Sequence, residues 1–196
     1  KEIEKTNITQ YRLGSLNPLE LTDEFIDFLS KSKKFCPHFH LSLQSFCNKT
    51  LKNMNRHYGE DDIFRLIETI NSKFERAFIG SDIIVGFPDE TNEDFETTRR
   101  NLSLVKLSQI HVFPYSLRKN TLAEKLPNHI DEKIKKERAG IIQEISDNKH
   151  FEFLKSNLNT TNTVILENRK DRETGLFKGV TKNYINILAD IKEMPN

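Results

Sequence analysis

Short apolar segments and amphipathic segments alternate along the chain up to residue 156. Residues 38–44 alternate strictly between polar and apolar side chains, which is typical of a β-strand with one covered face. Residues 60–72 instead repeat apolar residues at i, i+3, i+4 and i+7, which predicts an amphipathic helix. The same criteria predict strands at 10–15, 77–86 and 109–115, and helices at 22–34, 48–55, 131–156 and directly after Thr91.

This order of strands and helices predicts an α/β fold, in which helices cover a parallel sheet. A closed barrel of this type needs about eight strand–helix units, and the chain supplies about half of them. We therefore expect residues 1–156 to be the second half of a barrel or of an open half-barrel. Beyond residue 157, strands at 163–167, 177–181 and 184–188 and a turn at 171–175 predict the start of a small antiparallel module over 157–196.

One segment combines a buried strand with an unexpected charge. The β-branched run 83–85 reads as a core strand, Gly86 ends it, and Thr91 with Asp94 resembles a capping box that begins a helix. A strand, a glycine turn and a helix start form the layout of a ligand site at the carboxyl end of a parallel strand. Asp82 lies against the apolar run, where an isolated carboxylate is costly. It must lie at a rim, have a partner or hold a polar ligand.

The alternation also predicts which strand positions share a face. The inward positions are Arg12, Gly14, His38, His40, Ser42, Gln44, Asp82, Ile84, Gly86, Gln109, His111, Phe113 and Tyr115. The positions facing the helices are Leu41, Leu43, Ile83, Val85, Ile110 and Val112. A barrel of this type ordinarily fills its interior with bulky apolar residues. Any one polar residue could lie at a strand end in water, but the pattern over three strands predicts a polar cavity that holds a polar ligand.

The bulk composition narrows the possible classes of protein. The net charge of +1 gives no argument for a nucleic-acid partner, and the absence of any apolar run of about 18 residues predicts no membrane span. Two cysteines, Cys36 and Cys47, are too few for a disulfide framework, so we expect free thiols in a cytoplasmic protein. His38 and His40 could ligate a metal, but we expect structural histidines and no metal site. The first residue, Lys1, and the abrupt end indicate a piece of a longer protein.

Four phrases of the sequence together point to one family. They are His38–Ser45 followed by Leu51–Arg56, then Ser81–Thr91, then His111–Arg118 with Thr121 and Ala123, and finally Gly179–Tyr184. In this order they resemble the radical S-adenosylmethionine (SAM) methylthiotransferases. The third phrase is most similar to the branch that modifies threonylcarbamoyladenosine beside the tRNA anticodon. The resemblance implies a partial radical SAM barrel over 1–156, followed by the start of an RNA-binding module of the TRAM type.

The resemblance also implies roles for individual residues. Gln44 and Asp82 match family positions that contact the ribose and amino-acid portions of SAM, and Arg56 matches one that pairs with the methionyl carboxylate. The expected cofactor-binding set is Ser42, Gln44, Arg56, Asp82, Ile84 and Gly86, in which the backbone of Ile84 meets the adenine and Gly86 leaves room for it. The expected substrate contacts are Tyr115 and Arg118 and, in the TRAM-like module, Lys182 and Tyr184, which would contact the phosphates and bases of a tRNA anticodon stem-loop.

The chain departs from the family pattern in four respects. The family binds a [4Fe–4S] cluster through a Cys-x3-Cys-x2-Cys loop, which this sequence lacks, and the amino-terminal domain with a second cluster is missing. Phe46 and Cys47 replace the usual Gly-Ser, and Asp89 replaces a usual glycine. We therefore expect the cluster ligands to lie outside this chain, and the isolated fragment to be inactive. No catalytic residue is assigned.

The expected whole protein methylthiolates C2 of threonylcarbamoyladenosine in tRNA. Two alternatives within the family are the siblings that act on isopentenyladenosine in tRNA or on a ribosomal protein. A third alternative is a non-catalytic RNA-binding or folding module. A fourth is an ordinary barrel enzyme of metabolism, which predicts a bulky apolar interior instead of the polar one.

Overall fold

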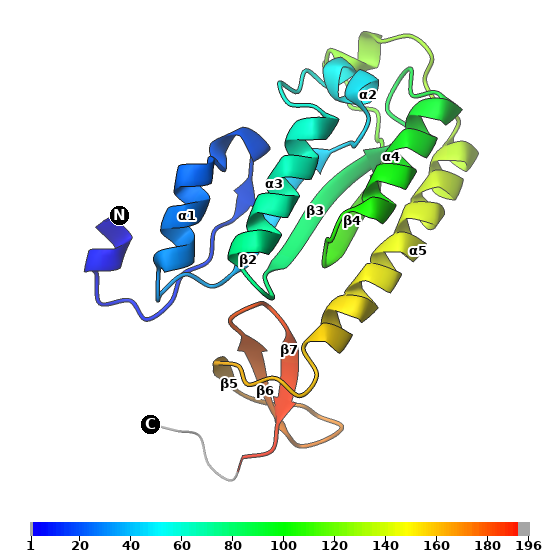
Figure 1. Cartoon of the computed structure of the whole chain (residues 1–196). Coiled ribbons are helices and arrows are strands. Elements are labelled where there is room, and N and C mark those ends of the chain that lie inside the picture. Colours follow the sequence, from blue (N-terminus) through cyan, green and yellow to red (C-terminus); the bar gives the residue numbers. More distant parts are fainter. Residues whose placement is uncertain (1, 192–196) are drawn as a thin grey trace.

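The computed structural model describes residues 2–191, which form two sheets (Figure 1). The first sheet is parallel, in the order β1 (Ser15–Leu16), β2 (His38–Gln44), β3 (Phe78–Val85) and β4 (Gln109–Pro114). The helices are α1 (Asp23–Lys31), α2 (Asn48–Asn53), α3 (Glu60–Lys73), α4 (Asn92–Leu104) and α5 (Glu132–Ser156), with 3-10 turns η1 (Glu2–Lys5), η2 (Pro18–Glu20) and η3 (Ala123–Lys125). The predicted α/β architecture is confirmed.

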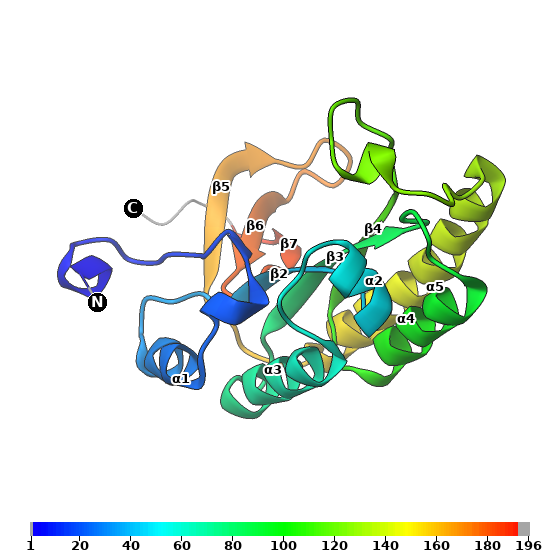
Figure 2. The same ribbon diagram turned by 90° about the horizontal axis from the view of Figure 1, so that it is seen from above.

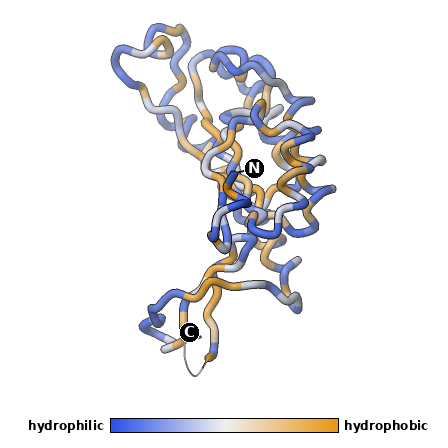
Figure 3. Tube along the Cα trace, turned by 90° about the vertical axis from the view of Figure 1, so that its left-hand side faces the viewer, coloured by the Kyte–Doolittle hydropathy of each residue, from blue (hydrophilic) through white to orange (hydrophobic). Residues whose placement is uncertain are grey.

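The helices cover one face of the parallel sheet and leave the other uncovered by helices (Figure 2). The covered face carries Leu41, Leu43 and Ile83, each 0% exposed, and the core continues through Ile63 and Ile70 of α3. Hydrophobic stretches accordingly run along the sheet and the inner sides of the helices, and hydrophilic ones lie on the outside (Figure 3). The prediction of which apolar residues face the helices is confirmed. Successive side chains of a regular strand point to opposite faces of the sheet, so the sequence pattern alone assigns each residue to a face.

Side-chain caps set where the helices begin. Thr22 accepts a hydrogen bond from the backbone N–H of Phe25 at the start of α1. Thr91 and Asp94 form the reciprocal capping box at the start of α4, as the sequence predicts. Because these caps satisfy N–H groups that the first helical turn leaves unpaired, the sequence fixes these helix starts locally.

The second sheet is antiparallel and lies beyond α5. It contains β5 (Val164–Lys170), β6 (Phe177–Thr181) and β7 (Asn186–Ala189), and the Asp171 carboxylate closes the predicted turn by accepting a hydrogen bond from the Thr174 N–H at 3.0 Å. Its burial is one-sided, since Phe177, Gly179 and Thr181 of β6 are buried. Residues 192–196, the end of the predicted module, lie outside the described residues. The boundary at 157 and the TRAM-like character stay predictions.

The second sheet packs against the parallel sheet at the amino-terminal ends of β2 and β3 (Figure 1). The Tyr184 ring lies 4.3 Å from the His38 ring and 5.4 Å from the Phe78 ring, measured between centroids. Asn183, which is buried, donates hydrogen bonds to the Arg76 carbonyl and to Asn157. We call this contact the joint. It leaves the carboxyl ends of the strands accessible.

Two sequence predictions need correction in this region. The predicted strand at 10–15 shrinks to Ser15–Leu16, and Tyr11 makes only an isolated bridge with Phe35. Gly14, predicted to face inward, is exposed. Arg12, also predicted to face inward, lies over the Tyr184 ring, which packs on His38, and donates a hydrogen bond to the Thr181 carbonyl at 2.8 Å. Thr181 lies 169 residues from Arg12 in the sequence, so the local alternation of polar and apolar residues could not predict this hydrogen bond.

Within residues 2–191, the structure contains no helix that is long and apolar enough to cross a membrane.

Candidate functional site

A cavity of about 450 Å³ opens at the carboxyl ends of β2, β3 and β4. Its lining residues are Gln44, Asp82, Ile84, Phe113, Pro114, Tyr115, Ser116, Arg118, Thr121 and Ala123. Five of the residues that the resemblance implies for SAM or substrate binding thus meet at one place. They come from β2, β3 and the segment after β4, and ligand sites of parallel α/β sheets lie at this end of the strands.

The inner face beneath this cavity is polar. His40 Nε2 lies 2.9 Å from Asp82 Oδ1, and both side chains are about one-fifth exposed. The His40 ring stacks on the His111 ring with centroids 5.3 Å apart, and His111 pairs with Asp82 across β3 and β4. Asp82 therefore has the partner that its burial required. The sequence places all three residues on one face but gives no sign of this pairing, which depends on the register between strands.

Gln44 occupies a strained backbone position at the end of β2. Its φ is +66°, and the pairing of β2 with β3 shifts register between Leu41 and Gln44. A positive φ is costly for a residue with a long side chain, and such strain gathers at binding sites. The irregularity redirects the end of the strand, and Gln44 lines the cavity beside Asp82.

Tyr115 forms one wall of the cavity. Its N–H donates to the Val85 carbonyl at 2.8 Å, and its ring packs edge-on against Phe87 at 5.2 Å, while Lys135 Nζ lies 5.4 Å from the ring centroid. The Tyr115 hydroxyl is buried without a hydrogen-bond partner among the described residues. Since buried hydroxyl groups are normally paired, this atom is a candidate contact for a polar ligand.

Gly86 has a neighbour in the protein that its expected role does not include. Its φ is +73°, and a Cβ placed there would lie 2.4 Å from Lys135 Cγ. The missing side chain thus makes room for Lys135 of α5, whose side chain is only 4% exposed, and Gly86 does not line the cavity. The close approach of this α5 side chain already requires a glycine here. Room for the adenine at Gly86 stays a prediction.

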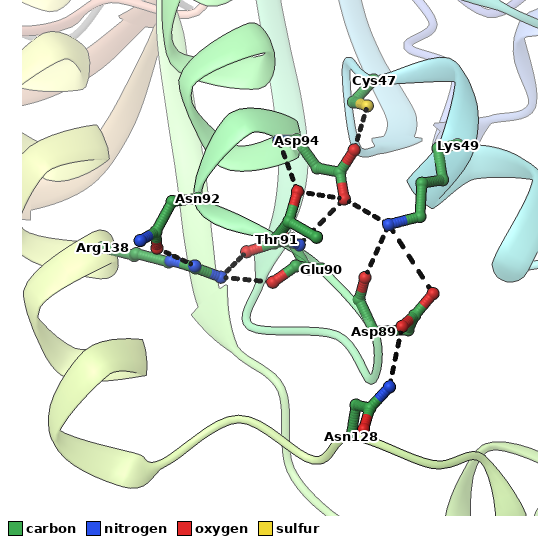
Figure 4. A network of polar contacts seen from close by, with 9 residues as sticks. All are labelled: Cys47, Lys49, Asp89, Glu90, Thr91, Asn92, Asp94, Asn128 and Arg138. Atoms are coloured by element: carbon green, nitrogen blue, oxygen red, sulfur yellow. Dashed lines mark hydrogen bonds and ion pairs between the residues drawn. The ribbon is translucent and has the colours of Figure 1, made fainter.

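A polar network holds the loop between β3 and α4 (Figure 4). The Gly86 N–H donates to Glu90 Oε1, and Arg138 of α5 pairs with the same carboxylate, where both side chains are almost completely buried. Burial raises the pKa of Glu90, although the Gly86 N–H and Arg138 act in the opposite direction. For Asp94, burial alone would raise the pKa, but hydrogen bonds from Lys49 and Thr91 outweigh burial. The net result is a lowered pKa.

Two other predicted cofactor contacts, Ser42 and Arg56, are not among the residues that line the cavity. Ser42 faces inward on β2, half-buried, and its carbonyl accepts a hydrogen bond from the Tyr58 hydroxyl at 2.9 Å. Arg56 lies close to the same hydroxyl, where its charge opposes the burial that raises the pKa of Tyr58. Arg56 Nε is buried without a hydrogen-bond partner among the described residues. Its pairing with a carboxylate stays a prediction.

Lys182 and Tyr184 lie at the opposite end of the sheet from the cavity. Lys182 Nζ donates to the Lys33 carbonyl at 2.9 Å, and Tyr184 packs in the joint, with the Arg12 guanidinium 5.4 Å from its ring centroid. Tyr184 remains 47% exposed. Contacts of these two residues with RNA stay predictions, and they would be made away from the cavity.

The residues present fit a nucleoside cofactor but not an iron–sulfur cluster. Cys36 and Cys47 are both buried and free, and residues 2–191 contain no group of three or more His, Cys, Asp or Glu placed to hold a metal. A cluster would need thiolate ligands from elsewhere. The cavity, by contrast, has the size of a small-molecule site and combines the polar Gln44 and Asp82 with the apolar Ile84.

Comparison with known proteins decides the family. The profile of the Radical SAM superfamily matches residues 10–102. Threonylcarbamoyladenosine tRNA methylthiotransferase MtaB from Aquifex aeolicus is 38% identical over 178 residues, which are 90% of this chain and 41% of that protein. The tRNA-2-methylthio-N(6)-dimethylallyladenosine synthase from Endomicrobium trichonymphae is 32% identical over 184 residues, which are 94% of this chain and 43% of that protein.

The chain belongs to the radical SAM methylthiotransferase family. It spans about two-fifths of the length of these curated methylthiotransferases. Among solved structures it resembles coproporphyrinogen III oxidase from Escherichia coli, described as a radical SAM enzyme, with a TM-score of 0.60 and 19% identity over 71% of this chain and 32% of that one. At this identity the likeness supports the fold alone, and it agrees with the parallel half-barrel. The cavity at the carboxyl ends of β2–β4 contains residues to which the resemblance assigns SAM binding.

Proposed function

We propose that the protein containing this chain is a tRNA methylthiotransferase that modifies C2 of threonylcarbamoyladenosine beside the anticodon. In this proposal the chain supplies the part of the enzyme that orients SAM and the substrate nucleoside. The observation that carries it is the meeting of Gln44, Asp82, Ile84, Tyr115 and Arg118 around one cavity. These residues come from three separate phrases of the sequence, so a chance gathering would be unexpected.

In this proposal, the side chains divide the cavity into an inner part that binds SAM and an outer part that binds the substrate nucleoside. Asp82, already oriented by His40, can accept hydrogen bonds from ribose hydroxyls or from the methionyl ammonium of SAM, and Gln44 can donate and accept beside it. Ile84 offers an apolar surface to the adenine ring. Tyr115 and the exposed Arg118 form the outer wall, where an RNA nucleoside and its phosphate would approach. When bound, SAM supplies the methyl group and the radical, while the protein supplies binding and orientation.

The reducing cluster must come from outside this chain, because the described residues do not fit one. We therefore propose that the isolated chain is inactive. Reconstitution of the 196-residue chain with iron and sulfide should yield no 5′-deoxyadenosine from SAM. Turnover in that assay would contradict the proposal.

A nucleoside profile of tRNA tests the substrate. Deletion of the gene that encodes this chain should abolish the 2-methylthio group on threonylcarbamoyladenosine, and the wild-type gene should restore it. A gene carrying Asp82→Ala should not, whereas Asp147→Ala, which changes an exposed carboxylate of α5, should. Such tRNA chemistry would take place in the cytoplasm.

The second candidate substrate is the isopentenyladenosine-type nucleoside in tRNA. Relatives named tRNA-2-methylthio-N(6)-dimethylallyladenosine synthase are 32–37% identical to the chain, close to the 32–38% of those named MtaB. Loss of the methylthio group from that nucleoside in the deletion strain would favour this candidate. An unchanged tRNA profile would contradict both, and would favour a ribosomal-protein substrate or a non-catalytic RNA-binding module.

A further inference from the structure

Residues 116–127, which we call the strap, form the outer wall of the cavity but are loosely attached to the rest of the protein. The strap contributes Ser116, Arg118, Thr121 and Ala123 to the cavity lining and projects from the body (Figure 2). Its hydrogen bonds within the described residues join strap residues to one another or to His129. Leu122 is 86% exposed, so apolar burial adds little to hold it. Segments with so few attachments open readily.

The strap is fastened at its far end by one residue pair. Asn128 Nδ2 donates to Asp89 Oδ1 at 3.0 Å, and the Asp89 N–H donates to the Asn128 carbonyl at 3.1 Å (Figure 4). Both residues have a left-handed backbone, with φ of +67° at Asp89 and +56° at Asn128. Asp and Asn tolerate this conformation better than most residues, so both the backbone and the side chains suit the contact.

Asp89 is itself held from the other side. Lys49 of α2 donates to the Asp89 carbonyl at 3.1 Å and lies 3.6 Å from Asp89 Oδ2, while its ammonium also pairs with Asp94 at 2.8 Å. The pair Asp89–Asn128 therefore connects the strap to the network that fixes the β3–α4 loop. Asp89 stands where the family resemblance implies a glycine, and a glycine could not form the side-chain bond.

We propose that the Asp89–Asn128 pair fastens the strap and so positions Arg118 and Thr121 against the substrate nucleoside. Asp89 is then a positioning residue that acts through the strap and touches no ligand. The part of this inference that concerns substrate rests on the proposed function. The fastening itself rests only on the geometry, so the two can be tested separately.

Amide hydrogen exchange of the 196-residue chain tests the fastening without any activity. Asp89→Gly keeps the left-handed backbone but removes the carboxylate, and it should speed exchange several-fold at the strap amides of Lys125 and Leu126, which are bonded within the strap. Asn128→Gly should do the same. Asp89→Asn retains an acceptor oxygen and should leave strap exchange near the wild-type rate. Asn159→Gly, the same change at another left-handed asparagine (φ +59°), is the matched control and should have no effect on the strap.

A charge swap makes the test specific to the pair. Asn128→Asp places a second carboxylate opposite Asp89 and should also speed strap exchange. The double variant Asp89→Asn with Asn128→Asp reverses donor and acceptor and should return exchange towards the wild-type rate. Unchanged strap exchange in Asp89→Gly and Asn128→Asp, with α3 exchange as the internal reference, would overturn the proposal, as would failure of the double variant to restore it.

The substrate part is tested in the full-length holoenzyme with an anticodon stem-loop RNA. Asp89→Gly should raise the KM for this RNA several-fold and leave the affinity for SAM unchanged, because the strap lines only the outer part of the cavity. An unchanged KM together with faster strap exchange would overturn the positioning role while leaving the fastening established. If the tRNA profile fails to support the proposed function, the exchange experiment still decides the fastening.

Discussion

His40 Nε2 lies 2.9 Å from Asp82 Oδ1, and these two residues come from neighbouring strands. The contact uses one carboxylate oxygen of Asp82 and fixes the orientation of the other, since His40 is itself held by stacking on His111. A carboxylate that lines a ligand cavity binds better when its rotamer is set in advance. The pair therefore links the polar inner face of the sheet to the affinity of the pocket.

Replacing His40 should weaken cofactor binding through Asp82. We predict that His40→Ala lowers the affinity of the full-length protein for SAM about tenfold, the effect of losing one hydrogen bond to a charged group. Equilibrium dialysis with labelled SAM measures it. Since His40 acts through Asp82, adding His40→Ala to Asp82→Ala should have little further effect. Additive losses in the double variant would show that His40 acts independently of Asp82.

The two glycines Gly86 and Gly140 should respond oppositely to alanine. Gly86→Ala places a Cβ 2.4 Å from Lys135 Cγ at a φ of +73°, so we predict a loss of about 1–3 kcal/mol in the free energy of unfolding. Gly140 lies within α5 with no heavy atom within 4 Å of an added Cβ, so Gly140→Ala should stabilise the fold by about 0.5–1 kcal/mol. Urea unfolding of both variants checks this pair, and equal stabilities would contradict the structural account of Gly86.

The joint should weaken in acid because of His38. Burial, with the nearby charge of Arg12 and His40 as lesser causes, lowers the pKa of His38 to about 4 from an ordinary value of 6.5. The fold thus favours the neutral ring, and its contribution is fully present above pH 6.5. Between pH 6.5 and 4 the unfolded chain gains a proton that the folded chain does not, so up to about 3 kcal/mol is lost.

The matched variant for this prediction is His38→Gln, which cannot titrate in that range. The free energy of unfolding of the wild type, measured from pH 7 to pH 4, should fall more steeply than that of the variant. The difference between the two curves removes the contribution of the carboxylates common to both. Parallel curves would mean that His38 is not buried at the joint as described.

Local pattern predicted the parts of the structure that local physics decides. Period-two alternation placed His40, Asp82 and His111 on one face, and the Thr91 capping box set the start of α4, because both depend on residues close in sequence. Resemblance to a family then named residues that the structure brings together at the cavity, such as Gln44 and Asp82.

The contacts that the sequence did not predict all join distant segments. Lys135 fills the space beside Gly86, Arg12 reaches Thr181, and Asn128 fastens to Asp89. Each contact depends on how α5, the second sheet or the strap packs against the parallel sheet and its loops. The pattern of residues in a single sequence does not predict such packing between distant segments. Gly86 and Asp89 both stand out in the sequence, but their partners are defined only in three dimensions.

The most direct test of the account is the affinity of the full-length, cluster-loaded protein for SAM in two matched carboxylate variants. Asp82→Ala removes a cavity residue, and Asp147→Ala removes an exposed carboxylate on α5. The account predicts that Asp82→Ala weakens SAM binding about tenfold or more while Asp147→Ala leaves it unchanged. Equal affinities of the wild type and Asp82→Ala would contradict the assignment of the polar inner face as the SAM pocket.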